Sequence, residues 1–76
     1  MTETTTGTPG MTVTVNGAAR DLRAGTTLPD LLAELRLGLG WVVVERNGEA
    51  LTRPIAAVTT LADGDVLEIV RAVAGG

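Results

Sequence analysis

The residue types that this 76-residue sequence lacks exclude most kinds of enzyme. It contains no Cys, His, Ser, Lys or Tyr. Without Cys and His no disulfide can form, and a transition-metal site would have to consist of carboxylates alone, so we expect no metal site. The common catalytic triads need Ser or Cys, and a Schiff base or a lipoyl arm needs Lys. We therefore expect no catalytic residues in this chain, and no enzymatic activity of its own.

Aromatic residues and positive charge are also scarce. Trp41 is the only aromatic residue, and the formal net charge at pH 7 is −3. Surfaces that bind nucleic acid interleave basic and aromatic residues, so we expect no nucleic-acid partner. No apolar run approaches the roughly 20 residues of a membrane span, and the N-terminus lacks the regions of a signal peptide. We expect a soluble, cytoplasmic monomer that does not bind a membrane.

The residues that are present indicate one small domain with a segment of different composition at each end. Apolar residues make up 45% of the sequence, which is enough for a single small core. Residues 1–10 are polar, of low complexity, and interrupted by glycine and proline, which predicts a disordered leader. The folded domain is expected over residues 11–71, and residues 72–76 are expected to form a flexible tail.

Two Asn-Gly dipeptides predict two tight hairpins. A type I′ turn needs a positive φ at both central positions, and Asn-Gly adopts this conformation readily. Alternating or β-branched residues flank both dipeptides, as strands require. The expected strands are residues 12–15 and 18–23 around Asn16-Gly17, and residues 41–46 and 49–52 around Asn47-Gly48.

One helix is expected between the two hairpins. Thr27 is a suitable N-cap, Asp30 completes an acidic variant of the capping box, and Pro29 is tolerated in the first turn. Gly38 is the expected C-terminal stop. Four leucines at helical spacing form an apolar stripe that we interpret as core rather than as a partner groove: Leu28, Leu31, Leu32 and Leu35.

The region after the second hairpin is expected to be irregular until the last strand. Pro54 disfavours helix at the preceding residue and cannot serve a central strand, so residues 53–57 are predicted to be irregular. Asp63-Gly64-Asp65 is interpreted as a turn because it offers too few ligands for calcium. Residues 66–71 form the last expected strand, with Leu67 and Ile69 on one face and Val66, Glu68 and Val70 on the other.

This order of elements predicts an α+β fold. The compact solution packs the helix on one face of a mixed sheet of four to five strands, with the first and last strands parallel at its centre. That arrangement is the β-grasp, or ubiquitin-like, architecture.

The C-terminus ends in two glycines after a run of small residues. Two glycines in these positions arise by chance in about 2% of chains with this glycine content. One interpretation is a frayed end, which glycine tolerates. The other is a carboxylate on an arm without side chains, thin enough to enter the active site of another protein.

Several segments together carry a resemblance. They are Val13-Thr14-Val15-Asn16-Gly17, the helix from Thr27 to Leu35, Val42-Val43-Val44, Asn47-Gly48-Glu49, Asp63-Gly64-Asp65 and the ending Glu68-Ile69-Val70-Arg71-Ala72-Val73-Ala74-Gly75-Gly76. On these segments, which span Met11 to Gly76, the chain resembles the ThiS family of ubiquitin-like sulfur carriers in thiamine biosynthesis. It departs from that pattern at Thr52-Arg53-Pro54-Ile55, where Pro-Arg and a nearby Trp are common, and at Arg46, where an apolar residue is common.

The resemblance implies that Gly76 carries the chemistry. Its carboxylate would be adenylated by an E1-like enzyme of the ThiF type, whose own ATP and Mg²⁺ serve the reaction. A persulfide sulfur donor would then convert the adenylate to a thiocarboxylate, and a thiazole synthase of the ThiG type would receive the sulfur. Val73, Ala74 and Gly75 would thread into the partner enzyme, and the chain itself would bind no cofactor.

A docking surface is expected beside the tail. Strand parity places Val43 and Val70 on the sheet face away from the helix, and Trp41 is a further candidate for this surface. Exposed apolar patches often mark interfaces. Scattered apolar residues on a surface need no such explanation, and this alternative stays open. Arg71 would either pair with an acidic groove of the partner or end the strand in solvent.

Other functions with the same fold also remain open. MoaD, the carrier used for molybdopterin, shares the fold and the tail, but it usually opens with a longer, aromatic-containing strand and often has prolines before its glycines. Carriers for tRNA thiolation or cysteine synthesis would use the same tail chemistry. A ubiquitin-like modifier or a plain interaction module is the remaining class, and the lack of lysine excludes only chains of this protein linked through its own ε-amines.

Overall fold

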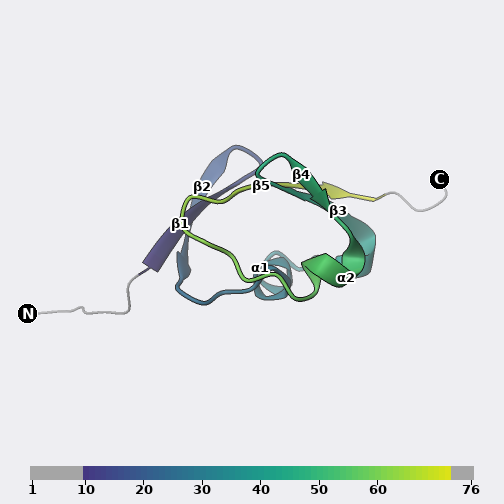
Figure 1. Ribbon diagram of the computed structural model, residues 1–76, viewed down its shortest axis with the longest axis horizontal. Coiled ribbons are helices and arrows are strands. Elements are labelled where there is room, and N and C mark those ends of the chain that lie inside the picture. Colours follow the sequence, from purple (N-terminus) through teal and green to yellow (C-terminus); the bar gives the residue numbers. More distant parts are fainter. Residues whose placement is uncertain (1–9, 73–76) are drawn as a thin grey trace, which may run out of the picture.

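A computed structural model describes residues 10–72 of the chain (Figure 1). The predicted leader and tail therefore lie outside the described residues, apart from Gly10 and Ala72. Regular structure begins at Gly10, one residue before the expected start of the domain. The elements in chain order are β1 (Gly10–Val15), β2 (Ala18–Arg23), α1 (Leu28–Glu34), the 3₁₀ turn η1 (Leu39–Trp41), β3 (Val42–Arg46), β4 (Glu49–Leu51), α2 (Arg53–Ala56) and β5 (Val66–Arg71).

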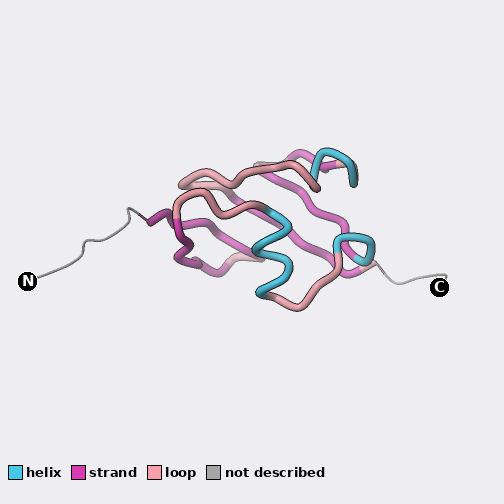
Figure 2. Tube along the Cα trace, turned by 90° about the horizontal axis from the view of Figure 1, so that it is seen from below, coloured by secondary structure: helices cyan, strands magenta, loops and turns pink. Residues whose placement is uncertain are grey.

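The five strands form one mixed sheet in the order β2-β1-β5-β3-β4. β1 and β5 are parallel, and all other neighbouring strands are antiparallel. Both helices lie against the same face of the sheet (Figures 1 and 2). The predicted β-grasp fold is confirmed, with the first and last strands side by side near the centre.

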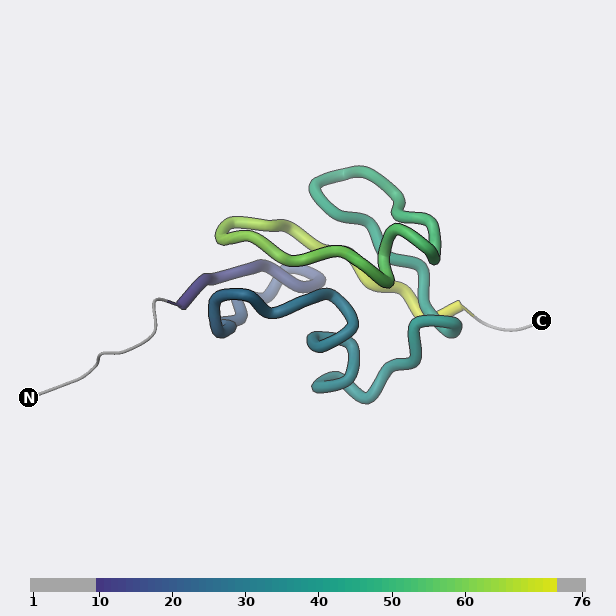
Figure 3. The backbone as a smooth tube through the Cα atoms, turned by 60° about the horizontal axis from the view of Figure 1, so that its bottom comes forward, coloured from purple at the N-terminus to yellow at the C-terminus, as the bar shows by residue number. Residues whose placement is uncertain are grey.

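The core lies between this face and α1. The leucine stripe of α1 is buried as predicted, with Leu35 at its edge, and Leu67 and Ile69 of β5 face it. Residues 57–65 run back along the sheet from α2 to β5 and close the core (Figure 3). The buried hydrophobic residues are Met11, Val13, Leu22, Leu28, Leu31, Leu32, Val44, Ala56, Leu61, Leu67 and Ile69.

The start of α1 confirms the predicted capping box. The Asp30 backbone N–H donates to Thr27 Oγ1 at 3.1 Å, and the Thr27 N–H donates to Asp30 Oδ2 at 3.1 Å. These two bonds satisfy backbone donors that the first turn of a helix leaves without partners.

The predicted end of α1 at Gly38 is wrong. The helix ends at Glu34, and Arg36 takes the left-handed conformation with a φ of 60°. The Arg36 N–H donates to Ala33 O at 3.0 Å, and the Leu37 N–H donates to Leu32 O at 2.8 Å. This pair of bonds is a Schellman motif, in which Leu37 packs against the core. The chain therefore leaves the helix two residues before the glycine, and an arginine occupies a position where glycine is usual.

Further boundaries differ from the predictions: β1 begins at Gly10 rather than Thr12, and β4 ends at Leu51 because Thr52 is the N-cap of α2. The third strand begins at Val42 rather than Trp41, because the Trp41 N–H donates to Gly38 O at 2.9 Å and closes η1. The segment predicted to be irregular contains the single-turn helix α2. There Thr52 Oγ1 accepts a hydrogen bond from the Ile55 N–H at 3.4 Å, and Pro54 lies in the first turn, where its missing N–H is not needed.

Both Asn-Gly turns are confirmed, since each pair has two positive φ values. They are 50° and 87° at Asn16 and Gly17, and 53° and 85° at Asn47 and Gly48. The two turns lie on opposite sides of β5, and each asparagine side chain bonds to residues at or next to that strand.

Candidate functional site

The predicted reactive end follows directly from β5, the middle strand of the sheet. β5 ends at Arg71, and the Ala72 N–H donates to Trp41 O at 2.7 Å. This bond ties the last described residue to η1. Val73, Ala74, Gly75 and Gly76 lie outside the described residues, so their roles in threading and in carrying sulfur stay predictions.

The first half of β5 is fixed by a buried carboxylate. Asp65 accepts hydrogen bonds from the Ala62 N–H at 2.8 Å, from Arg46 Nε at 2.9 Å and from Asn47 Nδ2 at 3.1 Å. Burial by itself would raise the pKa of Asp65, but these three hydrogen bonds and the charge of Arg46 together lower the pKa below its usual value. The carboxylate therefore stays ionised and holds the turn before β5 in place.

The Asp63-Gly64-Asp65 segment is a turn, as predicted. Asp63 Oδ1 accepts a hydrogen bond from the Thr12 N–H at 2.8 Å, so both carboxylates are used inside the fold. Among residues 10–72, no group of three acidic side chains is arranged to hold a metal ion.

The outer face of the sheet carries an apolar pair next to an acidic pair. Val43 and Val70 lie directly opposite each other on β3 and β5, with exposed fractions of 51% and 60%. Two residues further along, Glu45 and Glu68 also lie directly opposite each other. Like charges in this position are destabilising, and a cation from a binding partner would offset their repulsion. Strand parity thus places Val43 and Val70 correctly, and their role in docking stays a prediction.

Trp41 and Arg71 lie in a different place from the valine pair. They line a small hollow of about 260 Å³ together with Arg36, Leu37, Gly38 and Ala72. The structure therefore divides the predicted docking residues into two groups, one on the sheet face and one at the base of the tail. Arg36 is a residue of this second group that the sequence reasoning missed, because Gly38 was taken as the end of the helix.

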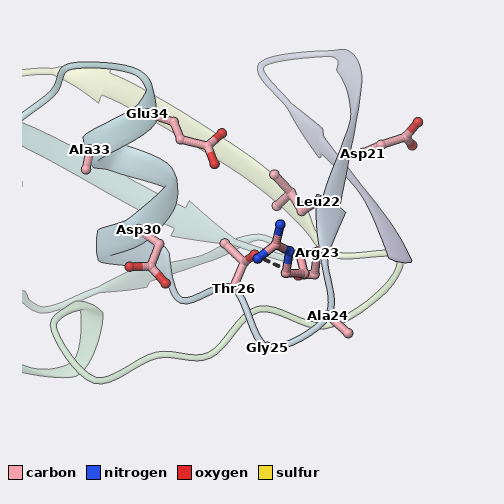
Figure 4. Close-up of a pocket in the computed structure, with 9 residues that line it drawn as sticks. All are labelled: Asp21, Leu22, Arg23, Ala24, Gly25, Thr26, Asp30, Ala33 and Glu34. Carbon is pink, nitrogen blue, oxygen red and sulfur yellow. Dashed lines mark hydrogen bonds between the residues drawn. The ribbon is translucent and has the colours of Figure 1, made fainter. Parts of the chain in front are cut away.

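A wider hollow lies between the β2–α1 loop and α1 (Figure 4). Thr26 Oγ1 donates to Arg23 O at 2.6 Å and shapes this loop. Arg23 pairs with Gly10 at the start of β1, and β1 runs parallel to β5, so this hollow lies at the other end of the sheet from Arg71. The residues that line it are Asp21, Leu22, Arg23, Ala24, Gly25, Thr26, Asp30, Ala33 and Glu34.

Over residues 10–72, none of the helices has the length and apolar character that crossing a membrane requires.

Two solved structures are similar to this chain in both sequence and fold. The crystal structure of the thiamine biosynthesis protein (ThiS) from Geobacter metallireducens is 35% identical, with a TM-score of 0.72 over 87% of this chain and 100% of that one. An NMR structure of a thiamine biosynthesis protein from the same organism is 36% identical, with a TM-score of 0.69 over 87% and 88% of the two chains. Together with the mixed sheet described above, these similarities define a ubiquitin-like β-grasp protein.

Sequence comparison gives the family within that class. The profile described as "ThiS family" matches residues 13–76, which is most of the chain and includes both terminal glycines. The chain belongs to the ThiS family. The resemblance seen in the sequence is therefore confirmed.

Two curated relatives are larger proteins. The thiazole synthases of Paramagnetospirillum magneticum and Magnetococcus marinus are 39% and 35% identical over 66 residues, or 87% of this chain. The match spans 20% of the length of each relative, so the chain corresponds to about a fifth of these proteins.

Proposed function

We propose that this protein is a cytoplasmic sulfur carrier for the thiazole ring of thiamine, and that the carboxylate of Gly76 is the sulfur-bearing group. The observation that carries this proposal is the ThiS family match, which runs through the tail to Gly76. The similarity to thiazole synthases favours thiazole formation over molybdopterin as the pathway that is supplied. The lack of Cys, His, Ser and Lys agrees with a carrier that relies on partner enzymes for catalysis.

The chemistry begins with activation of an inert carboxylate. A carboxylate at pH 7 is a poor electrophile, because its leaving group would be an oxide. A ThiF-type enzyme joins Gly76 to AMP with release of pyrophosphate, using its own ATP and Mg²⁺. The terminal sulfur of a donor persulfide attacks the acyl carbon, and AMP leaves. A second thiol then cleaves the new S–S bond and releases the thiocarboxylate.

The contribution of the chain is to present this end on a rigid base. β5 is bonded to a strand on each side, and Ala72 is held to Trp41, so the departure point of the tail is fixed. Gly75 and Gly76 lack Cβ atoms, and their backbone can pass through a channel too narrow for side chains. A ThiG-type thiazole synthase then receives the sulfur, and the chain holds no resident cofactor.

Intact-mass spectrometry tests the proposal directly. The mass of the purified chain first verifies that the protein ends at Gly76. After incubation with a ThiF-type enzyme, ATP, Mg²⁺ and a persulfide donor, the mass should rise by the replacement of one oxygen atom with sulfur.

Two tail variants provide the controls. Gly76→Ala and Gly75→Val should abolish the mass increase and leave the thermal unfolding temperature unchanged, because both positions follow the last strand. If Gly76→Ala gains sulfur at the wild-type rate, the tail is not threaded as proposed.

A further inference from the structure

An arginine in a strained backbone conformation stands at the end of α1. Three non-glycine residues among residues 10–72 have positive φ values, namely Asn16, Arg36 and Asn47. Asparagine tolerates this conformation well, whereas a long side chain such as that of arginine does not. Position 36 is the C′ position of a Schellman motif, where glycine is the usual residue. Strain of this kind often accompanies a functional side chain, so its surroundings are informative.

The surroundings of Arg36 are an exposed tryptophan and a second arginine. Arg36, Trp41 and Arg71 line the same hollow at the base of the tail, and we call these three residues the tail collar. They come from three separate elements: the end of α1, η1 and the end of β5. Trp41 has an exposed fraction of 61%, which is high for the single aromatic residue of the chain.

Backbone contacts fix the geometry of the tail collar. The Trp41 ring lies against Gly38, where an added Cβ would come within 2.8 Å of Trp41 Cδ1. The Ala72 N–H bonds to Trp41 O, which joins η1 to the end of β5. The two Schellman hydrogen bonds fix the backbone of Arg36, the third residue of the tail collar. The position of the exposed indole is therefore fixed by backbone contacts of Trp41 and its neighbours.

The tail collar also concentrates positive charge on an acidic protein. Within the described part of the chain two ion pairs form, Arg20–Glu34 and Arg46–Asp65, and neither uses a collar residue. The net charge of the chain is −3, yet two arginines line this hollow. Arginine and tryptophan are among the residue types that are enriched where binding energy concentrates in protein interfaces.

We infer that the tail collar binds a carboxylate-rich segment at the mouth of the channel through which a partner enzyme takes up the tail. Charge complementarity selects this occupant, because two cations next to an aromatic face match acidic side chains that flank a channel. Docking at the base of the tail fixes where the following residues enter the partner. The inference rests on the proposed carrier function for the identity of the partner, whereas the chemistry of the site rests on Arg36, Trp41 and Arg71.

The first experiment measures the apparent KM of the carrier in ATP–pyrophosphate exchange by a ThiF-type enzyme. Arg36→Gly removes the guanidinium and relieves the backbone strain, so a loss of binding cannot come from a loss of folding. We expect its KM to rise about fivefold to tenfold with kcat unchanged, as for a central interface residue. The rise should shrink at high salt, where the charges are screened. Arg23→Ala, at the other end of the sheet, is the matched control and should behave as wild type.

Two outcomes of this experiment would overturn the inference. If Arg36→Gly and Arg23→Ala have the same KM, the tail collar does not contact the partner. If the KM of Arg36→Gly falls, the collar binds the tail of its own chain and restrains it, which is a different occupant. If the wild-type chain is never activated, the proposed function is refuted. The binding property of the tail collar is then tested by the second experiment, which needs no partner enzyme.

The second experiment needs no partner enzyme, because Trp41 is the only aromatic residue and reports on its own site. Full-length wild-type protein is titrated with a hexaglutamate peptide at low salt while the Trp41 fluorescence is recorded. We expect a saturable change that is lost in Arg36→Gly, kept in Arg23→Ala and absent with hexalysine. An equal response to hexalysine, or saturation by inorganic phosphate at lower concentration, would contradict docking of an acidic segment.

Discussion

The two Asn-Gly turns have the same sequence and almost the same backbone angles, yet they hold β5 by different chemistry. Within the described residues the Asn16 side chain bonds only to the backbone of Ile69: its Oδ1 accepts from the Ile69 N–H at 2.7 Å, and its Nδ2 donates to Ile69 O at 3.0 Å. Asn47 Oδ1 accepts from the Val66 N–H at 2.9 Å, but its Nδ2 donates to the carboxylate of Asp65 at 3.1 Å. One turn is therefore neutral, and the other is coupled to a buried ion pair.

The difference follows from how each hairpin meets β5. β1 pairs with β5 only through Thr14 and Val15, and then turns away. The Asn16 N–H still donates to Leu67 O at 2.9 Å, and the Asn16 side chain then continues the ladder to Ile69. β3 pairs with β5 over five residues, and Asn47 extends this pairing because its N–H donates to Val66 O at 2.7 Å and its Oδ1 accepts from the Val66 N–H. Its Nδ2 remains for the carboxylate of Asp65, so this turn also joins the Arg46–Asp65 pair. The same dipeptide thus extends a short parallel pairing on one side and anchors a charged network on the other.

The largest expected difference between the two turns comes from removing the carboxylate of Asp65, which bonds to the Asn47 turn. Asp65→Ala leaves Arg46, the Asn47 amide and the Ala62 N–H without their acceptor, so we expect a loss of about 3 kcal/mol in the free energy of unfolding. Urea denaturation at pH 7 measures this loss. Asp63→Ala is the control, because Asp63 is exposed and accepts one bond; its cost should be about 1 kcal/mol. Equal losses in the two variants would show that the hydrogen bonds to Asp65 contribute no more to the free energy of unfolding than the single bond to Asp63.

The neutral side should give a somewhat smaller effect. Asn16→Ala removes both side-chain bonds to Ile69 and puts alanine at a positive φ, so we expect a loss of about 2 kcal/mol. Asn16→Gly keeps the turn conformation and removes only the amide, which separates the two causes. Hydrogen exchange of the Ile69 N–H should become faster in both variants. Unchanged exchange in Asn16→Gly would argue against the amide as the partner of β5.

The smallest expected effect is the loss of stability at low pH, and it is specific to the turn that contains Asn47 because it depends on Asp65. The folded-state pKa of Asp65 is lowered, so its contribution to stability is complete above the unfolded-state pKa and is lost as the pH falls through the folded-state pKa. Wild-type protein and Asn16→Gly should therefore lose stability below about pH 4, near the ordinary range of aspartate. Asp65→Asn should show a flatter profile in this window. The measurement is the unfolding midpoint from pH 7 to pH 2.5, and parallel profiles for all three proteins would contradict the assignment.

Local signals in the sequence were enough to predict most of the fold. Each Asn-Gly turn, the capping box of Thr27 and the alternation in residues 66–71 depend on residues a few positions apart, and the structure agrees with all of them. The predictions that failed depended on competition between local rules. Gly38 is the better helix stop by residue type, but packing of Leu37 on the core ended the helix earlier.

The candidate site was predicted only in part, for a similar reason. The alternation of β5 placed Val70 correctly, and the partner strand brought Val43 opposite to it. Nothing local joins Arg36 to Arg71, which are 35 positions apart and meet only when the end of α1 comes beside the end of β5. The Arg46–Asp65 pair was missed in the same way, since its residues meet only through the turn that precedes β5.

The central position of β5 also determines how the domain responds to mechanical force. A force applied to the C-terminus would pull lengthwise on a strand that has a neighbour on each side. The hydrogen bonds from β5 to β1 and to β3 would then be loaded in shear and would have to break together rather than one after another. We therefore expect the domain to resist unfolding by a force applied at its C-terminus.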